Sequence, residues 1–252
     1  MNYFLDTKET IPKGMGFPYF SKFHLLWLCG ITLFIAVLCI IYMNSDPKKR
    51  QTIRRIIVAL TVADELFKYI GLLLGGNFNA SYLPLHLCSI NIFLIVIHAI
   101  KPSKLLENFL YSFGIIPVAA ALLFPATCSI LPPMNFMVIH SLSIHALLLA
   151  YPLMLLSAGE LRRDPREFPR CLLLLLGFAA LAWCANTAFD TNFMFLREAA
   201  SGNPLFIFKQ LLGNHLWGYP ILIVPLFLVL YAPLLRHKHR NRPSVRISSN
   251  NF

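Results

Sequence analysis

Long apolar stretches dominate this sequence, and they restrict how the chain can fold more than any other feature. A helix needs about 20 predominantly apolar residues to cross the ~30 Å hydrocarbon core of a bilayer. Only 13% of the 252 residues are charged, against about 25% in typical soluble domains. We therefore predict an all-α fold, a polytopic membrane bundle of seven transmembrane helices. The seven stretches cover residues 23–43, 53–75, 83–100, 105–125, 134–156, 171–189 and 219–235.

The distribution of lysine and arginine predicts how this bundle is oriented. Cytoplasmic connections of membrane proteins carry an excess of these residues. With the first connection placed inside, sixteen basic residues fall inside and five outside, and Lys68 lies within a span. We expect residues 1–22 to form an outer N-terminal segment, 23–235 the seven-helix domain, and 236–252 a basic cytoplasmic tail. Contact with anionic lipid accounts for that tail, and we expect no nucleic-acid partner.

The second stretch carries three ionisable residues, Asp64, Glu65 and Lys68. Such residues are costly in hydrocarbon and usually face a bundle interior or a wet cavity. Asp64 and Lys68 are four residues apart, so they share one helix face and can pair. Glu65 is turned about 100° away, which leaves it available for another task. The three residues are therefore either a structural ion pair that fixes helix packing or part of a functional site.

The third stretch begins with a proline, a histidine and a cysteine, in the segment "SYLPLHLCSI" (81–90). If Pro84 is the first helical residue, Cys88 ends the first turn, where the positive end of the helix dipole favours a thiolate. Cys88 shares a helix face with Asn91. Residues two apart point about 200° from each other, so His86 can act as a base for Cys88 only if the backbone is perturbed. The alternative is a packed thiol beside a histidine that forms a hydrogen bond.

Histidines and amides of other stretches are predicted to gather at the same, outer end of the bundle. The fifth stretch contains "HSLSIH", which supplies His140 and His145. Counted from the outer ends, His140 and Cys88 lie at matching depths. His140 is therefore our first choice as general base and His86 the second, while Glu65 orients a histidine or stays paired with Lys68. The candidate substrate-binding residues are Asn91, His24, His145, Asn192 and Asn186.

Several short motifs, taken together, resemble the YwaF family of integral membrane proteins. They are "FSKFHLLWL", "LPLHLCSIN", a fourth stretch with glycine and proline, "HSLSIH" and "DTNFMFL" followed by "GNPL". That family is similar to a eukaryotic transmembrane acyltransferase that acts on ether lysophospholipids. The resemblance extends from about Ser21 to Tyr231. Many members have "NYGFL" where this chain has "NFMFL", so no specific role carries over to Phe193 or Met194.

The resemblance implies a seven-helix membrane enzyme with a cysteine nucleophile. Residue by residue, that role falls on Cys88 within "LHLC", with His86 in the same motif. His140 and the segment of Asn192 fall in the later motifs. The resemblance adds a reaction class to the site predicted above.

We accordingly predict a membrane-embedded acyltransferase or transacylase. Cys88 would attack a fatty-acyl carbonyl, and the resulting thioester would pass its acyl group to a hydroxyl of a second lipid. We expect phospholipid or lysophospholipid substrates, no cofactor and no metal. We also expect an integral protein of a bacterial inner (plasma) membrane whose site faces the outer leaflet. The oligomeric state is left open.

Two other functions remain open at this point. A transporter or lipid-binding channel would use the Asp/Glu/Lys cluster of the second stretch, because intramembrane charges are common in such proteins. It would depend on an ion gradient and be indifferent to Cys88. A zinc-dependent membrane hydrolase is the other alternative, although no HExxH motif is present. Its ligands would be His86, His140 and His145 with Glu65 or Cys88.

Overall fold

The computed structural model describes residues 3–126, 129–199 and 205–240, with side chains as far as Ala232. Within these ranges the chain is helical and contains no strand, which confirms the predicted all-α class. The principal helices are α1 (Lys22–Met43), α2 (Pro47–Leu74), α3 (Leu87–Ile100), α4 (Lys104–Phe109), α5 (Ile116–Leu123), α6 (Phe136–Ser157), α7 (Phe168–Phe189), α8 (Leu205–Leu212) and α9 (Gly218–Arg240). The short turns are η1 (Ala80–Tyr82), η2 (Leu110–Gly114), η3 (Pro165–Glu167), η4 (Phe193–Phe195) and η5 (His215–Trp217).

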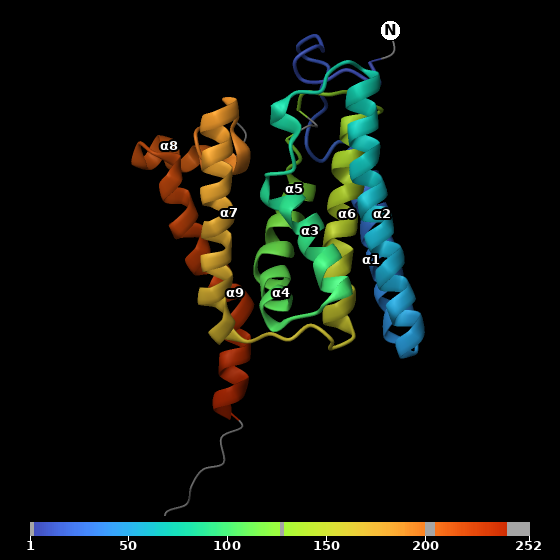
Figure 1. Ribbon diagram of the computed structural model, residues 1–252, viewed down its shortest axis with the longest axis vertical. Helices are drawn as coiled ribbons and strands as arrows, with labels where there is room; N and C mark the ends of the chain where they lie inside the picture. Colours follow the sequence, from blue (N-terminus) through green and yellow to red (C-terminus); the bar gives the residue numbers. More distant parts are fainter. Residues whose placement is uncertain (1–2, 127–128, 200–204, 241–252) are drawn as a thin grey trace, which may run out of the picture.

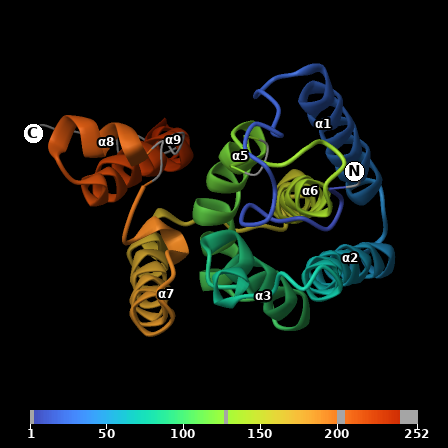
Figure 2. The same ribbon diagram turned by 90° about the horizontal axis from the view of Figure 1, so that it is seen from above.

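Helix α6 is the centre of the bundle. Its apolar side chains are distributed around its whole circumference, as expected for a helix buried among others. Helices α1, α2, α3 and α5 surround it, as Figure 2 shows from above. Helix α2 comes especially close, because a Cβ on Gly71 would lie 2.4 Å from the ring of Phe136. Helix α7 packs against α4 and α9 touches η2, so the last helices lie on the far side of α4 (Figure 1).

Five segments are long and apolar enough to cross a membrane among the described residues. They are Lys22–Met43, Lys104–Leu123, Phe136–Ser157, Pro165–Phe189 and His215–Ala232. Helix α2 has the length but carries charges at both its start and its middle. Helix α3 has 14 residues, about 21 Å, which is shorter than the hydrocarbon core. The seven-span count and the orientation therefore stay predictions. Helix α9 continues five residues into the predicted tail, and residues 241–252 lie outside the described ranges.

Helix α3 is short because its predicted first turn is extended chain. Pro84 disfavours helical geometry at the residue before it, and Leu83 has φ −59° and ψ 148°. His86 is still extended, with φ −73° and ψ 153°, so the helix begins at Leu87 and not at Pro84. The segment descends from η1 at the upper end of Figure 1 into the bundle. Non-helical backbone at such depth is tolerated where protein surrounds it.

The fourth predicted span is a broken helix. Between α4 and α5 the chain forms a π-helical turn at η2, whose five residues are all buried. Pro117 has no N–H, so the carbonyl of Phe113 loses its usual partner four residues on. The Nδ2 atom of Asn91 on α3 donates to that carbonyl at 3.4 Å. The side chain of one helix thus repairs the backbone of another.

The upper end of the bundle is covered by the N-terminal segment. Asn135 donates from Nδ2 to the carbonyls of Tyr3 and Asp6, at 2.8 Å each. Asn77 donates to the carbonyl of Leu5 at 2.9 Å. The hydroxyl of Tyr82 donates to Glu9 at 2.9 Å. These bonds tie the segment to the loops that precede α3 and α6 (Figure 1).

The lower end is fastened by one carboxylate, Glu160. It accepts hydrogen bonds from the Tyr42 hydroxyl at 2.5 Å and from Arg50 at 2.9 Å, and Arg54 lies 3.5 Å away. Burial alone would raise the pKa of Glu160, but these hydrogen bonds and the two guanidinium charges lower that pKa below its ordinary value. The connection between α1 and α2 is thereby joined to the one after α6.

Candidate functional site

Cys88 is the second residue of α3 and lies beside unpaired backbone donors. His86 is the N-cap residue, but its side chain makes no capping hydrogen bond. Within the described part of the chain, the amides of Leu87, Cys88 and Ser89 donate to no other protein group. Free amides at a helix start carry the positive end of its dipole. They can therefore stabilise negative charge on the sulfur or on an oxygen next to it.

The partner of the Cys88 thiol is His145 on α6. The imidazole lies close enough to the thiol for the two groups to interact electrostatically. The other side of the imidazole is fixed, because Nδ1 lies 2.5 Å from the carbonyl oxygen of Ser141. A carbonyl only accepts, so Nδ1 carries a proton and Nε2 is left for the thiol. A thiol, an imidazole and a carbonyl that orients the imidazole therefore lie next to one another, which are the groups that nucleophilic catalysis requires.

His140 points to a different neighbour. Its Nδ1 lies 3.2 Å from both the backbone oxygen and the Oδ2 atom of Asp64, and its Nε2 lies 3.7 Å from Glu65. The structure therefore brings His140 to the acidic residues of α2 and not to Cys88. Residues 140 and 145 are turned about 140° from each other on a helix. For that reason they reach two different helices that pack against α6: His140 faces α2 and His145 faces α3.

The charges of α2 are paired differently from our expectation. Lys68 contacts Glu65 at 2.5 Å, whereas the sequence suggested Asp64 as its partner. Asp64 accepts instead from the Ser143 hydroxyl at 2.8 Å. Packing against α6 explains why Lys68 pairs with Glu65 and not with Asp64. Ser143 and His140 of α6 lie against the face of α2 that carries Asp64, and they contact its carboxylate. Glu65 pairs with Lys68 and also faces His140, so it takes up both of the arrangements that the sequence suggested for it.

His86 joins the start of α3 to the segment after α7. Its Nδ1 accepts from the backbone amide of Met194 at 3.2 Å, and its ring packs on Phe193 and Phe195. Asn186 holds the same segment, because its Oδ1 accepts from the Phe193 amide at 2.6 Å. His86 and Asn186 therefore position the entry to α3 from the side of α7.

The remaining candidates lie in local networks. His24 is fully buried, accepts at Nδ1 from the Phe20 amide and faces the Leu122 carbonyl at 2.9 Å from Nε2. Asn192 bonds within its own turn, to the backbone of Arg197 and Glu198. Neither contacts Cys88 or His145. Asn91, on the Cys88 face of α3, is bonded to η2 as described above.

The described residues contain no group of three His, Cys, Asp or Glu side chains that could hold a metal ion. The three histidines considered as zinc ligands each face a different neighbour. His86 meets the segment after α7, His140 meets α2, and His145 meets Cys88. The predicted zinc ligands do not converge in this structure.

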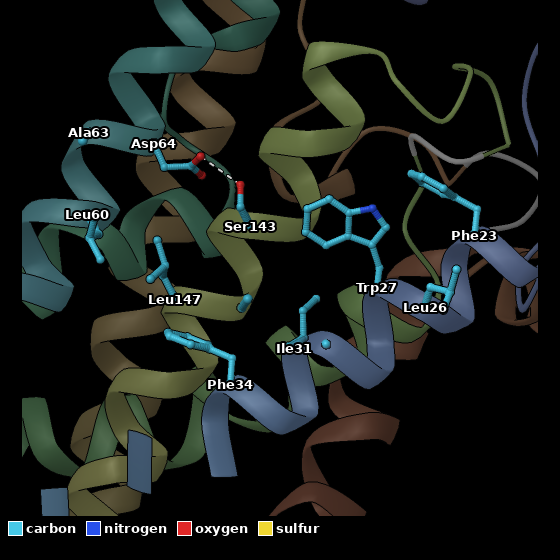
Figure 3. A pocket seen from close by; sticks show the side chains of 12 residues that line it. Phe23, Leu26, Trp27, Ile31, Phe34, Leu60, Ala63, Asp64, Ser143 and Leu147 are labelled. Atoms are coloured by element: carbon cyan, nitrogen blue, oxygen red, sulfur yellow. Dashed lines mark hydrogen bonds between the residues drawn. The ribbon is translucent and has the colours of Figure 1, made fainter. Parts of the chain in front are cut away.

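A hollow of about 730 Å³ opens between α1, α2 and α6, on another side of α6 from Cys88. Figure 3 shows Trp27, Ile31 and Phe34 of α1 facing Asp64 and Ser143 across it. Its lining is apolar except for those last two residues. The hollow therefore does not belong to the Cys88 site.

The comparison with family models shows which protein family the chain belongs to. The model of the TMEM164 family matches residues 19–234. The chain belongs to the TMEM164 family. This is a membrane protein family, in keeping with the five apolar spans. Neither the comparison with curated proteins nor that with solved structures gave a match.

Within this TMEM164-family chain, sequence reasoning did not identify the pairing of His145 with Cys88. It assigned His145 to substrate binding and matched His140 to Cys88 by depth alone. One signal was available, since Ser141 and His145 are four residues apart and a ring nitrogen can reach back to that carbonyl. The start of α3 at Leu87 then sets Cys88 deeper than the sequence count placed it.

Proposed function

We propose that this TMEM164-family protein is a membrane-embedded acyltransferase that moves a fatty acyl group between lipids through a thioester on Cys88. The closeness of the His145 imidazole to the Cys88 thiol, beside the free amides at the start of α3, carries the proposal. The resemblance to a eukaryotic transmembrane acyltransferase supports the same reaction class. We also propose seven spans, with the N-terminus outside and the site opening toward the outer leaflet.

In the first half-reaction the thiol proton moves to Nε2 of His145 as sulfur attacks the acyl carbonyl of a donor phospholipid. The carbonyl oxygen becomes negative, and the free amides of Leu87, Cys88 and Ser89 at the start of α3 would donate to it. The C–O bond to the donor then breaks. Its alkoxide takes the proton from His145, so a lysolipid leaves and the thioester remains.

In the second half-reaction the neutral imidazole of His145 takes the proton of an acceptor hydroxyl. The acceptor oxygen attacks the thioester, the C–S bond breaks, and the thiolate regains the proton from His145. The carbonyl of Ser141 keeps Nδ1 protonated throughout, so Nε2 remains the working nitrogen. A phospholipid donor suits a site within the membrane, because both substrates enter laterally.

The proposal is tested with purified protein in liposomes that contain a phospholipid labelled on its acyl chain and an unlabelled lysophospholipid. We expect labelled diacyl product from the acceptor and a hydroxylamine-sensitive label on the protein. Cys88→Ala should abolish both, while Cys39→Ala, which removes another half-buried thiol, should not.

The base is identified by comparing two histidines of α6. His145→Gln should lower the transfer rate by about 100-fold or more, as expected for loss of a general base. His140→Gln should have the smaller effect, because it contacts Asp64 and Glu65. Transfer by Cys88→Ala at the wild-type rate would disprove the mechanism, and a larger loss in His140→Gln would move the base to that residue.

A further inference from the structure

The hollow between α1, α2 and α6 continues along α1. A second hollow of about 340 Å³ is lined by α1 alone and shares Gly30 and Phe34 with the first. From Gly30 to Ile41 the second hollow follows the helix for eleven residues, about 16 Å. This is close to half of the hydrocarbon core, so the second hollow has the length of a lipid chain within one leaflet.

Gly30 is the junction of the two hollows and has no packing reason to be glycine. A Cβ at this position would meet no atom within 4 Å. Glycine within a helix is destabilising relative to alanine. At Gly71, by contrast, a neighbouring aromatic ring leaves no space for a side chain, so glycine is required there. The absent side chain of Gly30 leaves the passage between the hollows open.

Asp64 provides the polar end of the first hollow. Its Oδ1 accepts from Ser143, as Figure 3 shows. Its Oδ2 is buried and accepts no hydrogen bond among the described residues. His140 lies 3.2 Å away, but its Nδ1 also faces the backbone oxygen of Asp64 and has only one proton to give. This carboxylate oxygen, buried beside an apolar hollow, therefore keeps the capacity to accept one more hydrogen bond, and a small rotation of the side chain would present it to a ligand.

We propose that these hollows bind a single-chain amphiphile whose small polar end donates a hydrogen bond to Asp64 and whose tail passes Gly30 along α1. The size of the first hollow is typical of small-molecule sites. Its polar end suits a hydroxyl or an ammonium group. This site is separate from Cys88 and does not rest on the proposed acyl transfer.

The depth of Asp64 distinguishes this ligand from the lipids that surround any membrane protein. Asp64 is ten residues before the end of α2 at Leu74, about 15 Å along the helix axis. A bilayer phospholipid keeps its headgroup at the surface and would present only methylene groups here. A single-chain lipid with a slim polar end can bring its donor to that depth.

Binding can be measured through Trp27, which lines the hollow. The variant Trp183→Phe/Trp217→Phe keeps Trp27 as its only tryptophan. In nanodiscs it is titrated with hexadecyl alcohol, hexadecyl amine or hexadecane, each brominated on the chain to quench tryptophan fluorescence. We expect saturable quenching by the alcohol or the amine, and at least tenfold weaker binding of the alkane because a bond to a charged acceptor is lost.

Two substitutions locate the bound amphiphile. Gly30→Leu fills the junction and should abolish saturable quenching. Gly177→Leu is the matched control, since this glycine of α7 also has nothing within 4 Å of an added Cβ, and it should leave quenching unchanged. Asp64→Asn keeps the shape but removes the charge, and it should weaken the amine about tenfold. Cys88→Ala should bind as the wild type does, whether or not it transfers acyl groups.

Linear, unsaturable quenching that is equal in the two leucine variants would overturn the proposal, because it indicates only surrounding lipid. Equal affinity for the alkane and both polar probes would overturn the role of Asp64. Preference for the amine over the alcohol would identify an ammonium ligand, and the reverse a hydroxyl ligand. Either preference supports the site.

Discussion

At the scale of single residues, Glu160 shows how much one side chain can hold together. Its carboxylate is shared by the Tyr42 hydroxyl and by the guanidinium groups of Arg50 and Arg54. Arg50 also donates to the backbone carbonyls that end α1. Removing one member of such a partly buried group leaves the others without a partner, which costs about 1–3 kcal/mol.

The lowered pKa of Glu160 gives this contact a pH dependence. Since the pKa is lower in the folded protein, the contact stabilises fully above the ordinary value of 4.5 and is lost as the pH falls through the folded pKa. Glu160→Gln should therefore lower the midpoint of thermal unfolding in detergent at pH 7. The difference from the wild type should shrink as the pH falls below 4.5. A difference that is constant with pH would contradict this assignment.

The sequence predicted which residue types belong to the site, but not all of their partners. Cys88, His140, His145 and Glu65 were all chosen as polar groups within apolar spans. Depth along each helix could be counted, whereas rotation about the axis depends on which neighbours a helix packs against. His140 and His145 are five residues apart and therefore face different helices, a distinction that needs the packing of α2 and α3 around α6.

At the scale of elements, the π-helical turn η2 and helix α3 stabilise each other. Pro117 leaves the Phe113 carbonyl without its helical donor, and Asn91 supplies one. The irregularity of the fourth span could be predicted from its glycine and prolines. The hydrogen bond from Asn91 to the Phe113 carbonyl could not be predicted, because Asn91 lies 22 residues earlier and only the folded chain brings it there.

This dependence can be measured with a double-mutant cycle. Asn91→Ala alone should destabilise the protein by about 1–3 kcal/mol, because it leaves a buried carbonyl unpaired. In a Pro117→Ala background the new N–H can serve Phe113, so Asn91→Ala should cost less. Thermal unfolding in detergent of the four proteins gives the coupling energy. Additive effects would show that Asn91 acts elsewhere.

At the scale of the whole molecule, successive passes of the chain run in alternating directions: α1, α3, α6 and α9 descend in Figure 1, whereas α2, α4 with α5, and α7 ascend. The N-terminal segment and η1 share the upper end, and the Glu160 contact fastens the lower end. Five spans follow from length and composition, so the two remaining passes rest on α2 and α3. Helix α2 is not apolar enough to be recognised as a span because it carries charges. Helix α3 is too short to be recognised, because the residues that enter it are extended chain.

Single-cysteine labelling tests these two passes and the orientation. In a protein without its native cysteines, an impermeant maleimide should reach Lys13→Cys and Phe78→Cys from outside the cell. Lys49→Cys and Lys101→Cys should react only from the cytoplasmic side. All four positions are exposed. Labelling of positions 49, 78 and 101 from one side would mean that α2 and α3 do not cross.

The late start of α3 has a consequence for reaction outcome. An acyl group held on Cys88 would stand where alcohols of the membrane are abundant and water is scarce. Under the proposed chemistry, the partition of that intermediate between alcoholysis and hydrolysis would be fixed by where a helix begins. A chain that extended α3 upward to Pro84 would bring the same sulfur nearer the aqueous boundary and turn a transferase toward a lipase.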